Sequence, residues 1–174
     1  MENQLIVSIF ELSLSIIIGV LCFYLTHYVI IKIYSKKTVE ENPYKNMAFL
    51  IFLSGILFSI GYLLSGIMTP LSSTLDMLNN GQDSILHTLL SFTKYIIIFS
   101  SLGLLLGGLI NFITYFIFSS LTNKLNELDE IRNGNVGVAI LVSVIAIIMA
   151  LFCKEPFLIV LEYFIPYPEF PIIN

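Results

Sequence analysis

Apolar residues fall into four long runs that are separated by short polar segments. These runs extend over about Leu5–Ile33, Met47–Met68, Tyr95–Phe118 and Val136–Cys153. A helix needs about 20 apolar residues to cross the hydrocarbon core of a bilayer, and each run reaches or approaches that length. Because a spanning barrel would instead need short alternating strands, the pattern predicts four transmembrane helices.

Composition leads to the same class of protein. Of the 174 residues, 57% are apolar and only 11% are charged, whereas a soluble domain carries about 25% charged residues. Disorder is excluded because disordered chains are poor in apolar residues. The net charge of −4 offers no basic surplus for phosphates, so nucleic-acid binding is not expected. We therefore expect an all-α integral membrane protein surrounded by a lipid bilayer.

Positive charges set the expected orientation. Six of the eight Lys and Arg residues lie in the two connections that join the first run to the second and the third to the fourth. Because positively charged loops stay in the cytoplasm, we expect both connections there and both termini outside it. The N-terminal segment carries Glu2 and Glu11 rather than basic residues, so the first run is expected to be retained as a span and not cleaved.

Two further segments mix apolar and polar positions and are not expected to span. Residues 71–94 contain the turn sequence Asn79-Asn80-Gly81 and predict two short interfacial helices on the outer surface. The proline-rich tail is expected to lie in the outer interface, because its apolar run is too short to cross. The predicted organisation is thus a two-span unit over 1–70, an outer amphipathic connection over 71–94, a second two-span unit over 95–153 and an interfacial tail over 154–174.

The two halves of the chain resemble each other. A shift of 89 residues aligns Glu41 with Glu130 and Asn46 with Asn135. Each half holds two spans, so both halves enter the membrane in the same sense. This predicts two parallel helical-hairpin repeats, related by an axis along the membrane normal.

Matched residues in the two cytoplasmic turns have chemistry suited to helix ends. Asn46 and Asn135 are predicted to cap the helices that follow them. Glu41 and Glu130 are expected either to favour the positive helix ends or to pair with Lys45 or Arg132. In the structural interpretation, these turns only cap the helices that re-enter the membrane. In the functional interpretation, they act in gating or in docking a partner.

The same turns carry a resemblance to a known family. The stretch IYSKKTVEENPYKNMAFLIFLSG is similar to the first repeat of the YjfL-like small inner-membrane proteins, a domain-of-unknown-function family numbered 350. The resemblance implies a four-helix protein of the bacterial inner membrane, whose neighbours often include membrane-stress components, and it supplies no catalytic residues. It rests on Tyr34, Ser35, Lys36, Thr38, Asn46, Ala48, Ser54 and Gly55, and in the second half on Glu130, Ile131, Gly134, Asn135 and Ala139.

Polar residues within the spans are the candidates for chemistry. Glu11 lies about six residues into the first span, roughly 9 Å deep, and an intramembrane charge is a functional hypothesis by default. Alternatively, Glu11 reaches the outer interface or is protonated. His27 is expected to be a hydrogen-bonded packing residue. Asn111 and Thr114 share a helix face, where they either bond across the bundle or line a narrow polar pathway.

Small residues predict close helix packing. Gly55 with Ser59, and Gly103 with Gly107, lie four residues apart, and Gly108 follows directly. Such spacing lets helix backbones approach closely in lipid. These seams are expected either to join the four helices of one protomer or to build an oligomer.

No catalytic, metal-binding or phosphate-binding motif is found in the sequence, so we expect neither an enzyme nor a cofactor. The leading hypothesis is a non-enzymatic, self-assembling membrane component that serves an envelope-stress or defence-type module. It would dock a peripheral protein partner through its cytoplasmic turns. The alternative is an oligomeric ion channel or membrane-permeabilising effector, and the second alternative is a small transporter.

Overall fold

A computed structural model describes residues 2–35, 42–81, 85–121 and 126–165, and these residues contain helices and no strand. The predicted all-α class is therefore confirmed. The helices are α1 (Glu2–Ser35), α2 (Met47–Leu64), α3 (Met68–Gly81), α4 (Ile85–Leu121), α5 (Glu127–Arg132) and α6 (Val136–Glu162), with the 3-10 turns η1 (Pro43–Lys45) and η2 (Ser65–Ile67).

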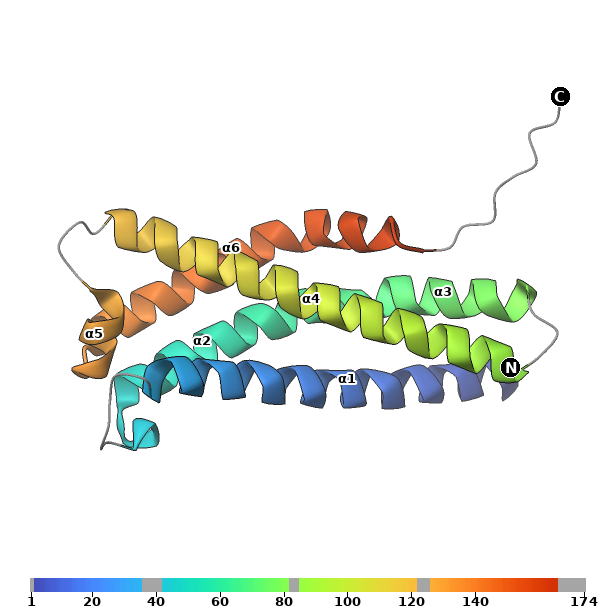
Figure 1. The fold of residues 1–174 in the computed structure, drawn as a ribbon, viewed down its shortest axis with the longest axis horizontal. Helices are drawn as coiled ribbons and strands as arrows, with labels where there is room; N and C mark the ends of the chain where they lie inside the picture. The colour runs from blue at the N-terminus through green and yellow to red at the C-terminus, as the bar shows by residue number, and fades with distance from the viewer. Residues whose placement is uncertain (1, 36–41, 82–84, 122–125, 166–174) are drawn as a thin grey trace, which may run out of the picture.

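The long helices run up and down in one elongated bundle (Figure 1). The short elements η1 and α5 lie together at one end of it, which we call the turn end. The start of α1, the end of α3 and the end of α6 lie toward the opposite end. The helices that leave the turn end, α2 and α6, form the most extensive helix pair of the bundle.

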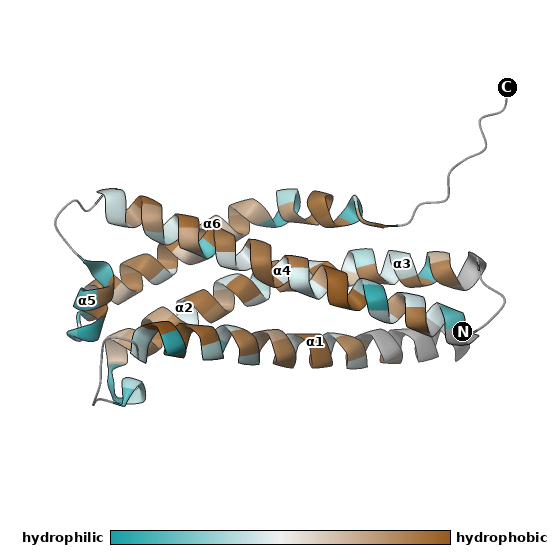
Figure 2. Ribbon diagram, viewed as in Figure 1, coloured by the Kyte–Doolittle hydropathy of each residue, from teal (hydrophilic) through white to brown (hydrophobic). Residues whose placement is uncertain are grey.

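Four helical segments are long and apolar enough to cross a membrane, which agrees with the four predicted spans. They extend over Leu12–Ser35, Met47–Leu78, Leu90–Ser120 and Val136–Glu162. Figure 2 shows hydrophobic residues along the middle of the bundle and hydrophilic residues gathered at α5. The chain is thus a multi-pass membrane protein. The membrane it occupies, the sides of its termini and its tandem repeat stay predictions.

The connection over residues 71–94 differs from the prediction of two separate short helices. Helix α3 continues α2 through η2, and residues 85–94 are the first turns of α4. Leu71 and Phe92 are buried in the same core cluster as Leu63 and Phe99, so packing extends both long helices. Pro70 is the third residue of α3, and in the first turn of a helix the missing proline N–H costs little because the N–H groups there have no partner within the helix.

The fourth helix also extends past its predicted end at Cys153. Helix α6 continues to Glu162 with Pro156 inside it, although an internal proline costs about 3 kcal/mol. Phe157 and Leu161 are buried in the main core cluster, and this burial offsets the cost. Residues 166–174 of the predicted tail lie outside the described residues.

The predicted small-residue seams lie within the protomer. Gly55 faces Ser143 of α6, whose Oγ donates to the Ile51 carbonyl at 3.1 Å. Ser59 on the same helix is fully buried.

The seam on α4 packs against α2 and its continuation. Gly103 faces Leu64 and Ile67, and Gly107 faces Ile60 and Leu63. Gly108 differs from the others, since a Cβ there would meet no heavy atom within 4 Å.

Substitution of Gly55 by Ala tests the α2–α6 contact. The new Cβ would lie 2.8 Å from the Ser143 Cα, so one helix must shift, and we expect a loss of about 1–3 kcal/mol in unfolding free energy. Gly61→Ala is the matched control, because a Cβ there meets nothing within 4 Å. SDS titration followed by circular dichroism measures both. Equal stability of the two variants would contradict the tight α2–α6 packing.

Candidate functional site

The turn before α2 is built by two asparagines. The Asn42 side chain accepts from the Tyr44 N–H at 3.1 Å, and Pro43 opens the 3-10 turn that follows. Asn46 then has an extended backbone (φ −93°, ψ 109°), and its Oδ1 accepts from the Phe49 N–H at 3.2 Å. The predicted cap of the second span is thereby confirmed.

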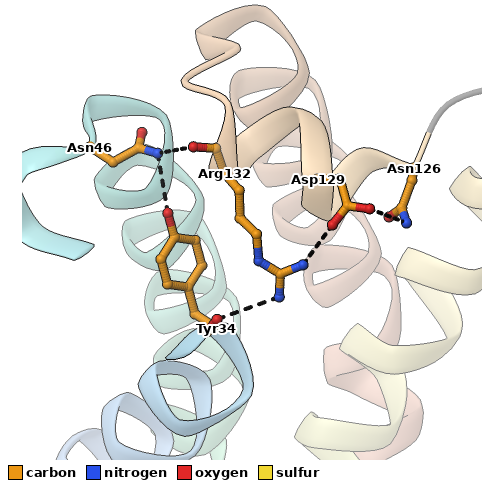
Figure 3. Close-up of polar contacts among 5 residues, drawn as sticks. All are labelled: Tyr34, Asn46, Asn126, Asp129 and Arg132. Atoms are coloured by element: carbon orange, nitrogen blue, oxygen red, sulfur yellow. Dashed lines mark hydrogen bonds and ion pairs between the residues drawn. The ribbon is translucent and has the colours of Figure 1, made fainter. Parts of the chain in front are cut away.

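Asn46 also joins the two turns to each other, as Figure 3 shows. Its Nδ2 donates to the carbonyls of Ile131 and Arg132, both at 2.9 Å, and to the Tyr34 hydroxyl at 3.2 Å. An amide has only two N–H donors, so these three acceptors share them. One side chain therefore ties α1, α2 and α5 together at the turn end.

Arg132 forms the second part of this junction (Figure 3). Its side chain is only 9% exposed and pairs with Asp129 at 2.7 Å. Its guanidinium lies 5.5 Å from the centre of the Tyr34 ring, and that ring packs on Phe49 at 4.0 Å. Asp129 also accepts from Asn126 at 2.6 Å. The junction thus combines an ion pair, a cation–π contact and an aromatic pair.

Glu130 does not form the predicted ion pair with Arg132. Asp129 pairs with Arg132 instead, because it lies three positions before Arg132 and therefore on the same face of the helix. Glu130 lies only two positions before Arg132 and is on a different face. Glu130 instead accepts from the Asn135 Nδ2 at 2.8 Å. It therefore lies at the start of α6, as the helix-end alternative predicted. Lys36 and Glu41 lie outside the described residues.

The turn before α6 repeats the capping chemistry. Asn135 has an extended backbone (φ −71°, ψ 93°) and accepts from the Val138 N–H at 3.3 Å, so the second predicted cap is also confirmed. Gly134 has φ +85°, a left-handed conformation that glycine adopts without strain. This glycine lets the chain reverse between α5 and α6.

A polar hollow of about 510 Å³ lies at the junction. Its basic lining residues are Lys45 and Arg132, and none of its lining residues is acidic. The hollow, called the cationic hollow below, could accept an anionic group of moderate size. It is lined by Tyr34, Asn42, Pro43, Lys45, Asn46, Met47, Arg132, Asn133 and Gly134.

The polar residues predicted within the spans are mostly bonded locally. Asn111 and Thr114 are both buried on α4, and they donate to the carbonyls of Gly107 and Ile110 at 2.9 and 2.7 Å. These donors therefore bond within their own helix and not across the bundle.

His27 forms a hydrogen bond between its Nε2 and the Tyr44 hydroxyl at 3.1 Å, and its packing role stays a prediction. Glu11 lies in α1, but its side chain is outside the described part. Among the described residues no cluster of His, Cys, Asp or Glu could hold a metal ion.

An apolar cleft of about 450 Å³ opens between α1 and α4, and α2 forms part of its wall. Its α1 side extends from Leu25 to Tyr34, and its α4 side from Leu104 to Tyr115. No charged residue lines it, and Gly108 lies on its edge. This lateral cleft, as we call it, lies at the depth of the membrane spans.

Sequence reasoning missed the central position of Tyr34. Its side chain lines both the cationic hollow and the lateral cleft. A signal was present, because Ile18, Cys22, Thr26, Ile30 and Tyr34 recur every four residues and predict one buried stripe on the first helix. Of these five, all but Ile30 are buried.

Lys154 also has partners that the sequence did not indicate. Its Nζ contacts the Ser65 Oγ at 3.3 Å and lies 4.3 Å from the centre of the Tyr62 ring. The side chain thereby links α6 to α2 toward the end opposite the turns.

A family model described as Domain of Unknown Function (DUF350) matches residues 3–155. This match confirms the numbered family that the sequence predicted, while the YjfL-like name stays a prediction. No curated protein and no solved structure matches the chain.

Substitutions of the two capping asparagines test the junction. Asn135→Ala removes a cap and a local contact and should cost about 1 kcal/mol of unfolding free energy. Asn46→Ala should cost about 2–4 kcal/mol, because it also leaves the Arg132 carbonyl at the end of α5 without its side-chain donor. SDS titration followed by circular dichroism measures the difference.

Asn46→Asp separates the two roles of Asn46. Aspartate is an equally good cap acceptor but has no N–H to donate, so the variant should stay close to Asn46→Ala in stability. Stability equal to that of the unsubstituted protein would refute the bridging role.

Proposed function

The chain belongs to the DUF350 family, and from that premise we propose that it is a non-enzymatic membrane scaffold that docks a peripheral protein at its turn end. The proposal includes the bacterial inner membrane as its location, with the turn end in the cytoplasm. It also includes self-assembly and service to an envelope-stress or defence-type module.

The observation that carries the proposal is the joining of two distant turns into one surface. Asn46 bonds to Ile131 and Arg132, which lie 85 and 86 positions further along the chain. Because both turns are held by one network, their exposed residues keep a defined arrangement. Such an arrangement suits recognition, since a preorganised surface loses little entropy on binding. The exposed residues of this surface, called the platform below, are Asn42, Tyr44, Lys45, Asn133 and Gly134.

Self-assembly is supported by the thin packing of α1. Along its described side chains only Ile18, Cys22, Thr26 and Tyr34 are buried, and most of the others are exposed. The exposed side chains of α1 are mainly large and apolar. A second protomer could pack against this apolar face, and native mass spectrometry of the protein in nanodiscs measures the resulting oligomeric state.

The channel and transporter alternatives have less support. Asn111 and Thr114, the candidates for a polar pathway, donate to carbonyls of their own helix. The lateral cleft that they line opens to the side of the bundle and is apolar. A channel would thus need several protomers around a shared axis, and a ring of four or more in native mass spectrometry would favour it over the scaffold.

Site-specific photo-crosslinking tests the platform in cells. A benzoylphenylalanine at Asn133, which is exposed on the platform, should form a discrete adduct with a soluble protein. The same residue at Phe152, which is 76% exposed on α6, should form none, because that position faces lipid. Adducts of the same soluble protein at both positions, or none at Asn133, would contradict docking at the platform.

A further inference from the structure

The lateral cleft has the properties of a binding site for a hydrocarbon chain. It lies within the membrane spans, its volume of about 450 Å³ is in the range of small-molecule pockets, and no charge lines it. Asn111 and Thr114 each donate a hydrogen bond within α4, and the buried Oδ1 of Asn111 has no hydrogen-bond partner among the described residues. The surrounding solvent at this depth is lipid, so an acyl chain is the occupant that is most abundant and best matched.

The cationic hollow begins where the lateral cleft ends. Tyr34, one residue before the end of α1, lines both. On the hollow side, Lys45 is exposed, while the guanidinium of Arg132 is nine-tenths buried, pairs with Asp129 at 2.7 Å and donates to the Tyr34 carbonyl at 3.5 Å. An apolar cleft and a basic hollow therefore meet at the level where a bilayer changes from hydrocarbon to headgroups.

We propose that the lateral cleft and the cationic hollow together bind one anionic phospholipid. One acyl chain lies between α1 and α4, and the phosphate accepts a charge-assisted hydrogen bond from Lys45, with the positive charge of Arg132 beside it. Basic pockets between transmembrane helices bind anionic headgroups in this way. A free phosphate would use only the hollow and leave the cleft empty, so a lipid accounts for both features.

The bound lipid has a structural consequence for α1. This helix buries few of its side chains, and the lateral cleft separates part of it from α4. A chain in the cleft supplies the dispersion contacts that direct packing lacks. The lipid would thus hold α1 against the bundle. This inference rests on the two cavities and not on the docking of a protein partner.

Two variants with matched controls test the two halves of the site. Gly108→Phe should fill the lateral cleft, because a Cβ at this position meets nothing within 4 Å. Gly61→Phe is its control, since Gly61 is equally open but lines a separate crevice between α1 and α2. Lys45→Gln removes a charge from the cationic hollow. Lys94→Gln, exposed near the start of α4, is the matched control at the other end.

Native mass spectrometry should count the lipids that remain after release from nanodiscs of equal parts phosphatidylglycerol and phosphatidylcholine. We expect one phosphatidylglycerol on the unsubstituted protein and on both controls. Gly108→Phe and Lys45→Gln should each reduce its retention about tenfold, the loss expected for about 1.4 kcal/mol of binding free energy.

Three outcomes would overturn the proposal. They are unchanged retention in Gly108→Phe, equal retention of phosphatidylcholine, and complete displacement by inorganic phosphate, which would assign the hollow to a soluble anion.

A phosphatidylglycerol with a diazirine in one acyl chain gives a second reading that does not depend on a variant. It should label residues 25–34 and 104–115, and labelling only of the exposed face of α6 would also refute the site. Failure of the Asn133 crosslink would not affect any of these results.

Discussion

Backbone carbonyls at the end of a helix have no partner within that helix. At the end of α5, N–H groups of the following turn bond to the carbonyls of Asp129, Glu130 and Ile131, and the Arg132 carbonyl bonds to the side chain of Asn46. The amide of Asn46 caps α2 with its oxygen and donates with its nitrogen to the last carbonyls of α5 and to the Tyr34 hydroxyl. Through Tyr34 the contact extends to α1, and through Arg132 to Asp129. The relative positions of the two turns, and with them the cationic hollow, depend on this amide.

The helices of the bundle differ in how closely they pack against one another. Helices α2 and α6 approach closely where Gly55 meets Ser143, and α4 packs on α2 through Gly103 and Gly107. The described side chains of α1 form no such seam, because the buried ones lie in a single row and Gly19 meets no neighbour. This difference explains why two crevices at the depth of the spans border α1. In the proposed site an acyl chain fills the lateral cleft, so lipid and protein together hold this helix.

Function and stability place different demands on the turn end. Its internal contacts use Asn46, Arg132 and Asp129, while Lys45 and Asn133 remain exposed beside them. The proposed scaffold role uses the outer surface of this end, and the proposed lipid site uses the hollow and the cleft beneath it. Both proposals thus depend on the junction that holds the two turns together.

The number of spans, the helical class and the two asparagine caps could be predicted from the sequence alone. These features depend on local chemistry: the length of an apolar run sets whether it can span, and a cap bonds to an amide three residues away. Helix ends were less predictable, since burial of Leu71, Phe92 and Phe157 extends three helices through polar or proline-containing segments.

Contacts between distant residues were decided only by the tertiary structure. The bridge from Asn46 to α5 and the meeting of cleft and hollow at Tyr34 both depend on how the helices are placed. One sequence pattern is compatible with several such placements, because lipid solvates the apolar faces of a helix as well as another helix does. Close packing at Gly55 and the hydrogen bonds of the junction select among them.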